Sequence, residues 1–178
     1  MPACSGFGLV PSREARENGG FKEVMAQHEP PQASRMRSRI LLVDSHVVVR
    51  QGLTLLINQE PDLLVCGGVS LTPAALEAIP KLMPNLVVTD ITLKNGNGLE
   101  MIKIIAAQHS KLPVLVLTMH EEGPYAQVAL RSGAMGYIMK EEPIEKLLVA
   151  IRRVLSGKIY LSESASLQMI RRQIGGPA

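Results

Sequence analysis

Five short apolar runs recur along this chain, and each is followed by a polar or turn-forming segment. The runs are rich in Val, Ile and Leu and lie at Ile40–Val43, Leu63–Cys66, Leu86–Thr89, Val114–Leu117 and Tyr137–Met139. Short, almost continuous apolar runs are typical of strands buried on both faces, and such strands form parallel sheets. The pattern therefore predicts a five-stranded parallel sheet.

Helical patterns separate these runs. Apolar residues at helical spacing predict helices over 47–58, 74–79, 99–108, 124–132 and from Pro143 to just before Gly157. Pro73 suits a first helical turn, and Gly133 and Gly157 suit helix ends. Five strand–helix units in succession predict a three-layer α/β sandwich, a (βα)5 fold with right-handed crossovers.

Composition excludes several classes of protein. Aromatic residues make up 3% of the 178 residues, so a stacking platform for single-stranded nucleic acid is not expected. The net charge of +3 is too small to indicate nucleic-acid binding by itself. No apolar run approaches the roughly 18 residues of a membrane span. The two cysteines, Cys4 and Cys66, form no CxxC pair, so we expect a cytoplasmic protein with reduced thiols and no membrane partner.

Polar residues gather where the predicted strands end. The chain has only three aspartates; Asp44 and Asp90 directly follow apolar runs, and Asp62 lies in a turn after Pro61. Thr118 and Lys140 follow two further runs. In open α/β sheets, ligands bind at the carboxyl ends of the strands. We therefore expect Asp44, Asp90, Thr118 and Lys140 to converge at one edge, and Asp62 to be structural.

This set of side chains matches the needs of phosphoryl transfer. An aspartate carboxylate can attack phosphorus, and carboxylates can hold Mg²⁺. Positive charge from Mg²⁺ and a lysine can stabilise the equatorial oxygens of the transferred group, and a threonine hydroxyl can donate a hydrogen bond to one of them.

The same segments carry a family resemblance. The runs ILLVDSHVVVRQGL, LVVTDITLKNGNGLE, VLVLTMH and SGAMGYIMK resemble the receiver domain of two-component response regulators, most closely the NarL/FixJ (LuxR-type) subgroup. The match covers about residues 39–162. It implies a flavodoxin-like receiver fold and, in most members of that subgroup, a helix-turn-helix domain after the receiver.

The resemblance also implies roles for particular residues. Asp90 would be the phosphoacceptor, Thr118 the switch hydroxyl and Lys140 the phosphoryl-binding ammonium. Tyr137 would be the aromatic residue whose rotamer follows phosphorylation, although a role as a plain core residue remains open. Either role leads us to expect a half-buried ring with a solvated hydroxyl.

The expected metal site departs from the family pattern. By resemblance, Mg²⁺ would be held by Asp44, Asp90 and the backbone carbonyl of Thr92. The family usually has two consecutive acids after the first strand, and the second is ordinarily a direct ligand, whereas this chain has Ser45 there. Since affinity for a hard cation follows ligand charge, we predict weak Mg²⁺ binding and slow phosphorylation.

Two histidines lie near these motifs. The four histidines of the chain show no spacing typical of metal ligands. We therefore expect His46 to be a polar contact at a helix start or a surface residue. His120 either influences water access to an acyl phosphate or is an exposed loop residue.

The flanking segments differ from the central region in texture. Residues 1–38 have the composition of a disordered or weakly ordered tail, and residues 163–178 read as a basic linker or tail. No helix-turn-helix fits after residue 162. We therefore expect either a receiver-only fragment or a natural single-domain protein, with DNA contacted only through a C-terminal domain that this chain lacks.

These observations predict a phosphoacceptor signalling module and not an enzyme, beyond self-catalysed phosphotransfer and dephosphorylation. The expected phosphodonor is a sensor histidine kinase or a phosphotransfer protein, and the expected output is homodimerisation and transcriptional control. A degenerate receiver that dimerises or binds proteins independently of phosphorylation is the alternative, because of Ser45.

Overall fold

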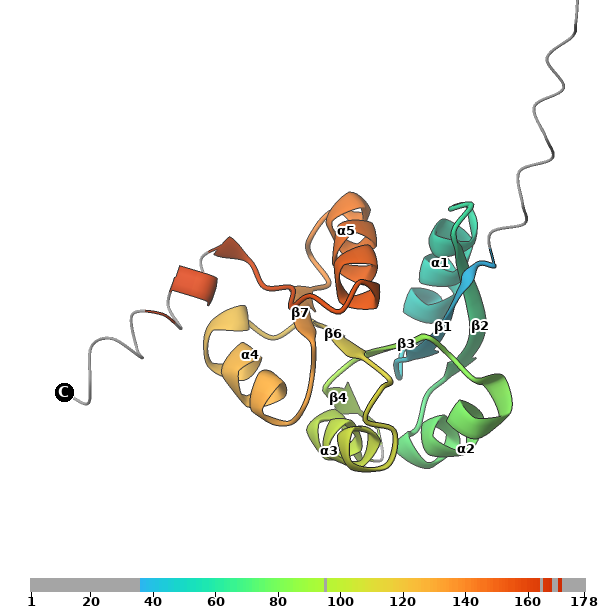
Figure 1. Ribbon diagram of the computed structural model, residues 1–178, viewed down its shortest axis with the longest axis horizontal. Helices are drawn as coiled ribbons and strands as arrows, with labels where there is room; N and C mark the ends of the chain where they lie inside the picture. Colours follow the sequence, from blue (N-terminus) through green and yellow to red (C-terminus); the bar gives the residue numbers. More distant parts are fainter. Residues whose placement is uncertain (1–35, 95, 164, 168–169, 171–178) are drawn as a thin grey trace, which may run out of the picture. The chain divides into compact units, whose positions relative to one another are not determined.

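The computed structural model describes residues 36–94, 96–163, 165–167 and 170 (Figure 1). Most of the two predicted tails therefore lies outside the described residues. Ser38, which we assigned to the N-terminal tail, is the first residue of a strand, and its amide donates to the carbonyl of Asp62 at 2.8 Å. That boundary was wrong by one residue because sheet pairing extends the strand past its apolar run.

The predicted five-stranded parallel sheet is confirmed. Its strands lie in the order β2-β1-β3-β6-β7, and every neighbouring pair is parallel. Their bounds are Ser38–Val43 (β1), Leu63–Val69 (β2), Leu86–Thr89 (β3), Val114–Thr118 (β6) and Gly136–Met139 (β7). This order places β1, β3, β6 and β7 side by side, so the residues that follow them share one edge.

Five helices cover the two faces of the sheet. They are α1 (Val47–Asn58), α2 (Thr72–Leu82), α3 (Gly98–Gln108), α4 (Glu122–Arg131) and α5 (Ile144–Leu155). Helices α1 and α5 lie on one face, and α2, α3 and α4 lie on the other (Figure 1). The three-layer flavodoxin-like fold is therefore the one that the alternation of patterns predicted.

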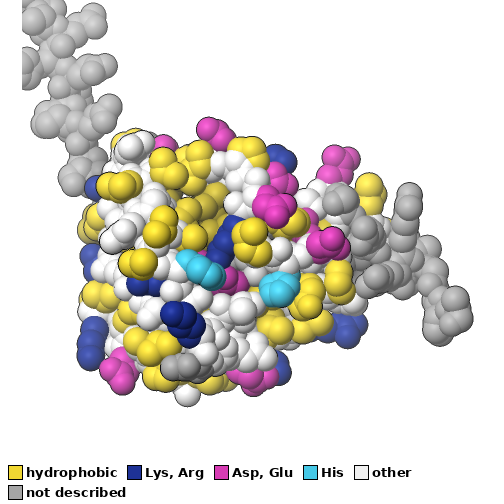
Figure 2. Space-filling model, turned by 180° about the vertical axis from the view of Figure 1, so that it is seen from behind, with side chains coloured by type: hydrophobic (Ala, Val, Ile, Leu, Met, Phe, Trp, Pro, Cys, Tyr) yellow, Lys and Arg dark blue, Asp and Glu magenta, His cyan; other side chains and the backbone are white. Residues whose placement is uncertain are grey.

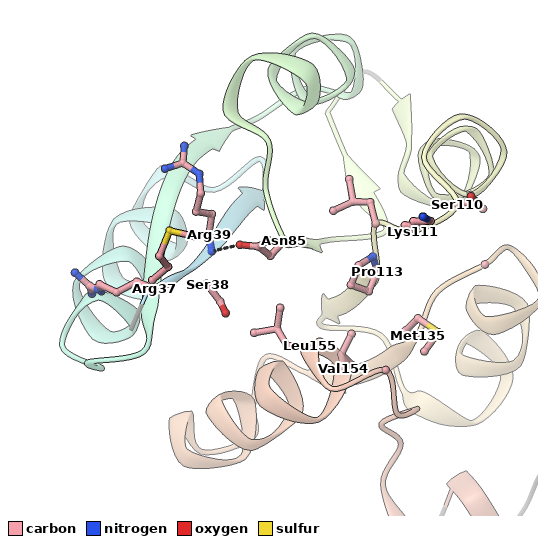
Figure 3. Close-up of a pocket in the computed structure, with 15 residues that line it drawn as sticks. Arg37, Ser38, Arg39, Asn85, Ser110, Lys111, Pro113, Met135, Val154 and Leu155 are labelled. Atoms are coloured by element: carbon pink, nitrogen blue, oxygen red, sulfur yellow. Dashed lines mark hydrogen bonds between the residues drawn. The ribbon is translucent and has the colours of Figure 1, made fainter. Parts of the chain in front are cut away.

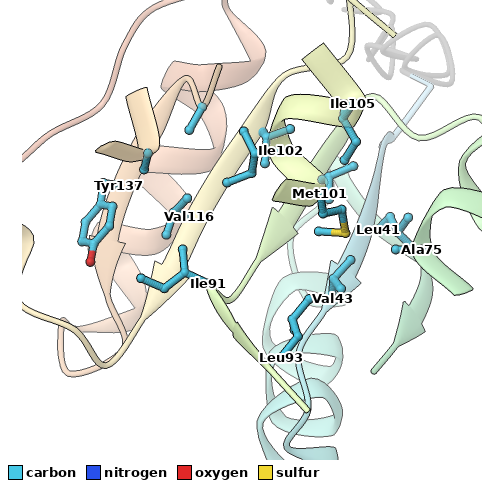
Figure 4. Packing of buried hydrophobic residues seen from close by; sticks show 14 of the residues in the cluster. Leu41, Val43, Ala75, Ile91, Leu93, Met101, Ile102, Ile105, Val116 and Tyr137 are labelled. Atoms are coloured by element: carbon cyan, nitrogen blue, oxygen red, sulfur yellow. The ribbon is translucent and has the colours of Figure 1, made fainter. Parts of the chain in front are cut away.

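Alternate side chains of each strand build two separate cores. In β1, Leu41 and Val43 pack toward α2 and α3, and this core includes Met101 and Tyr137 (Figure 4). Ile40 and Leu42 point to the opposite face and pack with residues of α1 and α5. Because both faces of the central strands are buried, these strands are apolar along most of their length, which is the origin of the runs in the sequence.

Helix α2 and the segment after β3 differ from the sequence-based expectation, and β2 extends three residues past Cys66. Helix α2 extends three residues past Ile79 and includes Pro80, with Pro73 in the first turn as predicted. A short antiparallel hairpin, β4 (Thr92–Leu93) with β5 (Gly96–Asn97), follows β3 and was not among the predicted elements. Strands of two residues carry no periodic signal, so pattern analysis could not find them.

Candidate functional site

The four polar residues predicted to converge do so at the carboxyl edge of the sheet. Asp44 follows β1, Asp90 follows β3, Thr118 ends β6 and Lys140 follows β7. Backbone pairing continues past the strands and holds them in place: the amide of Asp90 donates to the carbonyl of Val43 at 2.9 Å, and that of Lys140 donates to Thr118 at 2.8 Å.

Asp90 lies at the centre of this group and is only 4% exposed. The hydroxyl of Thr118 donates to its Oδ1 at 2.7 Å, the amide of Thr92 donates to the same oxygen at 3.1 Å, and Nζ of Lys140 donates to Oδ2 at 2.5 Å. Burial by itself would raise the pKa of the Asp90 carboxyl. The hydrogen bonds from Lys140, Thr92 and Thr118 outweigh burial and hold that pKa below its ordinary value.

Lys140 bridges the two buried carboxylates. Its Nζ lies 2.5 Å from Oδ2 of Asp44 and 2.5 Å from Oδ2 of Asp90, and the three side chains are 8%, 6% and 4% exposed. The two carboxylates would repel each other at this depth without a cation between them. Lys140 therefore holds together the part of the site that would bind phosphoryl oxygens and the part that would bind metal.

Gly98, the first residue of α3, packs closely against the backbone of Asp90. A Cβ at Gly98 would lie 2.3 Å from the backbone oxygen of Asp90 and 2.7 Å from the Cα of Ile91, so no larger residue fits without moving the backbone. The amide of Gly98 donates to the carbonyl of Ile91 at 3.0 Å and begins α3. The close approach of this helix fixes the position of the loop that carries Asp90.

His46 makes a polar contact at the start of α1 and is exposed, as expected, and this contact brings it to the site. It is the N-cap residue of α1; its amide donates to Oδ1 of Asp44 at 2.7 Å, and its Nδ1 lies 3.1 Å from the same oxygen. Ligand atoms of Asp44, His46 and Asp90 all lie within 4.8 Å of one another. Histidine spacing gave no indication of this, because the partners are carboxylates on two strands.

Tyr137 departs from the expected environment. We expected a half-buried ring, but the residue is 0% exposed, and its hydroxyl donates to the carbonyl of His120 at 3.0 Å. Burial, followed by the charges of Glu122 and Asp90, raises the pKa of this phenol. The expectation was wrong because the loop after β6 covers the ring and accepts its hydrogen bond.

The loop after β6 also reaches the loop after β3. Nε2 of His120 lies 2.8 Å from Oγ1 of Thr92, and the rings of His120 and Tyr125 have centroids 4.8 Å apart. His120 is thus partly buried by these contacts, so the interpretation as an exposed loop residue is wrong. Thr92 presents its amide to Asp90 and its hydroxyl to His120.

A cavity lies at the opposite end of the sheet. It has a volume of about 700 Å³ and is lined where strands begin, by residues such as Ser38, Pro113 and Met135 (Figure 3). Arg37 donates to backbone carbonyls of Asn58 and Glu60, so its charge is already engaged. None of the converging polar residues lines this cavity.

The comparison with protein families identifies the group to which this edge belongs. The response regulator receiver domain matches residues 40–152, which include Asp44, Asp90, Thr118 and Lys140. The chain belongs to the response regulator receiver family. Members of this family are signalling domains, and receiver domains bind Mg²⁺ at an acidic pocket.

Individual relatives place it in the NarL/LuxR-type group. The oxygen regulatory protein NreC of Staphylococcus aureus is 31% identical over 133 residues, which are 74% of this chain and 61% of NreC. A LuxR-family response regulator from Aurantimonas sp. SI85-9A1 is 29% identical with a TM-score of 0.72, over 78% of this chain and 99% of that structure. This chain thus spans less than two thirds of the length of NreC.

Two structures of the response regulator RcsB are also similar. The isolated receiver domain of Salmonella enterica serovar Typhimurium RcsB, with the phosphomimetic BeF3⁻, is 25% identical with a TM-score of 0.67 and covers 74% of this chain and 98% of that structure. A structure of two RcsB dimers bound to two parallel DNAs is 26% identical with a TM-score of 0.67. The match covers 73% of this chain and 66% of that one. Among the described residues, no helix is long and apolar enough to span a membrane.

Proposed function

We propose that this receiver accepts a phosphoryl group on Asp90 and so controls dimerisation and, through a DNA-binding domain of the full protein, transcription. One observation carries the proposal. The carboxylate of Asp90 is buried at the sheet edge between a hydroxyl at 2.7 Å and an ammonium at 2.5 Å, from Thr118 and Lys140. This is the pair of groups that a phosphoryl oxygen on Asp90 would need.

The proposed step transfers the group from a phosphohistidine. A carboxylate oxygen of Asp90 attacks phosphorus, the P–N bond of the donor breaks, and the leaving imidazole takes up a proton from solvent. The product is an acyl phosphate, which water later hydrolyses to restore Asp90. Lys140 would stabilise negative charge on the equatorial oxygens, and the low pKa of Asp90 keeps it in the nucleophilic, ionised form.

Mg²⁺ would add positive charge to the same oxygens when bound. The carboxylates of Asp44 and Asp90 and the backbone carbonyl of Thr92 would hold it. These groups fit a hard cation, but Ser45 supplies no charge where the family usually supplies a carboxylate. We therefore infer weak Mg²⁺ binding and slow phosphorylation.

The contacts of Thr118 and Tyr137 supply a path from Asp90 to the surface. A phosphoryl group on Asp90 would compete with the carboxylate oxygen for the Thr118 hydroxyl, which lies 2.7 Å from it. Thr118 leads into the loop whose His120 carbonyl accepts from Tyr137 at 3.0 Å. We propose that this loop and Tyr137 form the element that has two arrangements.

The proposed partners follow from the family. A sensor histidine kinase or a phosphotransfer protein would supply the phosphoryl group, and a second copy of the chain would complete the dimer. We propose residues 38–162 as the receiver, since Ser38 begins β1, with 1–37 as an N-terminal tail and 163–178 as a basic linker. The similar RcsB structure, two dimers bound to two parallel DNAs, supports a DNA-bound dimer as the output of the full protein. The cytoplasmic location stays a prediction.

Intact-mass measurement tests the proposal directly. The chain is incubated with acetyl phosphate and a divalent cation, and we expect the mass of one added phosphoryl group. Asp90→Asn abolishes this adduct, and Asp62→Asn, which changes the aspartate outside the site, leaves it unchanged. An adduct that persists in Asp90→Asn contradicts the proposal. Absence of any adduct would favour the phosphorylation-independent dimerisation module.

A further inference from the structure

The third donor of the acidic cluster is an imidazole. In the described part of the chain, Asp44, His46 and Asp90 are the group whose ligand atoms lie within 4.8 Å of one another. Figure 2 shows a face of the molecule on which histidine, acidic and basic side chains gather among hydrophobic ones. Ligands of a tetrahedral ion with metal–ligand bonds of about 2.0–2.2 Å lie roughly 3.3–3.6 Å apart, so these three atoms would have to approach one another by up to about 1.5 Å to share one ion.

This donor set differs from the one that Mg²⁺ prefers. Mg²⁺ takes oxygen ligands in octahedral geometry and is held mainly through carboxylates. Imidazole nitrogen suits Zn²⁺ and its first-row neighbours, which also accept carboxylate oxygen. Ser45 removes one charged oxygen from the edge, while His46, one residue further along, brings a nitrogen to within 3.1 Å of Oδ1 of Asp44.

The backbone holds His46 in this position. Its amide is bonded to Oδ1 of Asp44 at 2.7 Å, and its carbonyl accepts from the amide of Arg50 at 3.1 Å in the first turn of α1. The guanidinium of Arg50 also donates to the backbone carbonyl of Asp44. The side chain of His46 is 65% exposed, so an ion reaching the cluster from solvent meets the imidazole first.

Lys140 and His46 contact Asp44 through different oxygens. Lys140 contacts Oδ2 of this carboxylate, whereas His46 contacts Oδ1. Asp44, Asp90 and Lys140 together carry a net charge of −1. That single negative charge is a poor match for a cation held mainly by electrostatic attraction, and a better match for one that also bonds to neutral nitrogen.

We propose that Asp44, His46 and Asp90 form a binding site for a first-row transition-metal dication of the Zn²⁺ class, with His46 as a direct ligand. The proposal rests on the proposed function only for its location, since the ion would occupy the site assigned to Mg²⁺. It makes His46 the residue that sets metal selectivity at this edge.

Isothermal titration of the whole chain with ZnCl₂, and separately with MgCl₂, tests the proposal. Four proteins are compared: the native chain, His46→Ala, Ser45→Asp, and His109→Ala as a matched histidine control at the end of α3. We expect His46→Ala to weaken Zn²⁺ binding at least ~10-fold, since loss of even an outer-shell partner has effects of that size, and to leave Mg²⁺ affinity within about twofold. His109→Ala should change neither affinity.

Ser45→Asp gives the complementary result. It should strengthen Mg²⁺ binding by ~10-fold and so narrow the ratio of Zn²⁺ to Mg²⁺ affinity, because it restores a charged oxygen. The imidazole nitrogen resonances of His46 should shift on addition of Zn²⁺ in the native chain. Zinc affinity alone does not show that His46 is a ligand, since zinc binds many protein surfaces. Dependence of that affinity on His46 does show it.

Two results would overturn the proposal. One is Zn²⁺ affinity in His46→Ala equal to that of the native chain, and the other is the same loss in His109→Ala. Phosphorylation is measured in parallel. A phosphoryl adduct on Asp90 with Mg²⁺ but no His46-dependent Zn²⁺ binding refutes this inference and leaves the proposed function intact. Zn²⁺ binding that depends on His46 without any adduct refutes the proposed function and leaves this inference intact.

Discussion

The carboxyl edge of the sheet has two halves that differ in how closely they follow the family. The phosphoryl half, formed by Asp90, Thr118 and Lys140, has the residues that the resemblance implies. Thr118 and Lys140 each donate a hydrogen bond to the carboxylate of Asp90. The metal half, formed by Asp44, Ser45 and His46, has a neutral residue in place of an acid and a histidine beside it.

The difference shows how much each half depends on its surroundings. The phosphoryl half is buried, and its residues come from three neighbouring strands, so any change there disturbs packing as well as chemistry. The metal half lies in the loop between β1 and α1, where His46 is 65% exposed. A residue in this loop can be substituted without disturbing the hydrophobic core. The metal preference of the site can therefore differ from that of the family while the geometry around Asp90 is kept.

The largest expected effect comes from Lys140→Met, because Lys140 belongs to both halves. Removing the ammonium leaves two carboxylates buried side by side without a counter-ion, and loss of one partner of a buried ion pair is strongly destabilising. We expect the free energy of unfolding to fall by about 3–5 kcal/mol, measured by urea denaturation. Asp44→Asn in the same protein should restore part of the loss; a simple sum of two losses would contradict the bridging role.

Gly98→Ala tests the support behind the phosphoryl half. The added Cβ would meet backbone atoms of Asp90 and Ile91, which cannot rotate away as a side chain can. We expect a loss of about 3 kcal/mol in thermal or urea denaturation, the upper end for overpacking. Gly52→Ala, where the Cβ meets nothing within 4 Å, is the matched control and should cost far less. Equal stabilities of the two variants would refute the close approach.

Thr118→Val changes the phosphoryl half alone. Valine keeps the shape of the buried side chain but removes the hydroxyl that donates to Asp90 at 2.7 Å. A hydrogen bond to a charged group contributes about 2 kcal/mol, so we expect a loss of this size in unfolding free energy. The pKa of Asp90 should rise, because one bond that lowers it is gone. Zn²⁺ binding should still depend on His46, because the bond that is removed joins Thr118 to Asp90; loss of that dependence would show that the halves are not separable.

Ser45→Asp changes the metal half alone. A third carboxylate at the edge repels Asp44, so we expect the metal-free protein to lose about 1 kcal/mol of stability. Millimolar Mg²⁺ should raise the melting temperature of the variant more than that of the native chain, because a ligand that binds the folded state stabilises it. Differential scanning fluorimetry with and without Mg²⁺ measures both effects. Equal Mg²⁺-induced shifts would mean that residue 45 does not face the ion.

Acid titration is expected to show the smallest effect, and only at low pH. The pKa of Asp90 in the folded protein is below its ordinary value of 3.8, so the folded state binds fewer protons than the unfolded state. Its stabilising contribution is present above that ordinary pKa and is lost as pH falls through the lower folded value. Asp90→Asn should therefore flatten the fall in unfolding free energy below about pH 4.

Asp62→Asn is the control for this titration. The hydrogen bond from Arg152 also lowers the pKa of Asp62, but that carboxylate is 44% exposed and is screened by solvent. Its removal should flatten the acid limb much less than Asp90→Asn does. Equal flattening in both variants would show that burial at the sheet edge adds nothing to the effect.

Much of the fold could be predicted because its signals are local. The apolar runs located all five strands of the main sheet, and the polar residues after three of these runs predicted the composition of the phosphoryl half. The hairpin of β4 and β5 and the extension of α2 through Pro80 were missed, since neither has a periodic pattern. The roles of Asp90, Thr118, Lys140, Tyr137 and Thr92 stay predictions that the experiments above test.

The sequence by itself determined the order of strands and helices, because buried parallel strands require continuous apolar runs. It also determined the set of chemical groups at the sheet edge, because polar residues directly follow these runs. The tertiary structure alone decided which groups touch. It places Lys140 between two carboxylates, brings the hydroxyl of Tyr137 to the carbonyl of His120, and brings the imidazole of His46 to the carboxylate of Asp44. Such contacts join residues of different strands and loops, so their distances depend on packing, which no local pattern records.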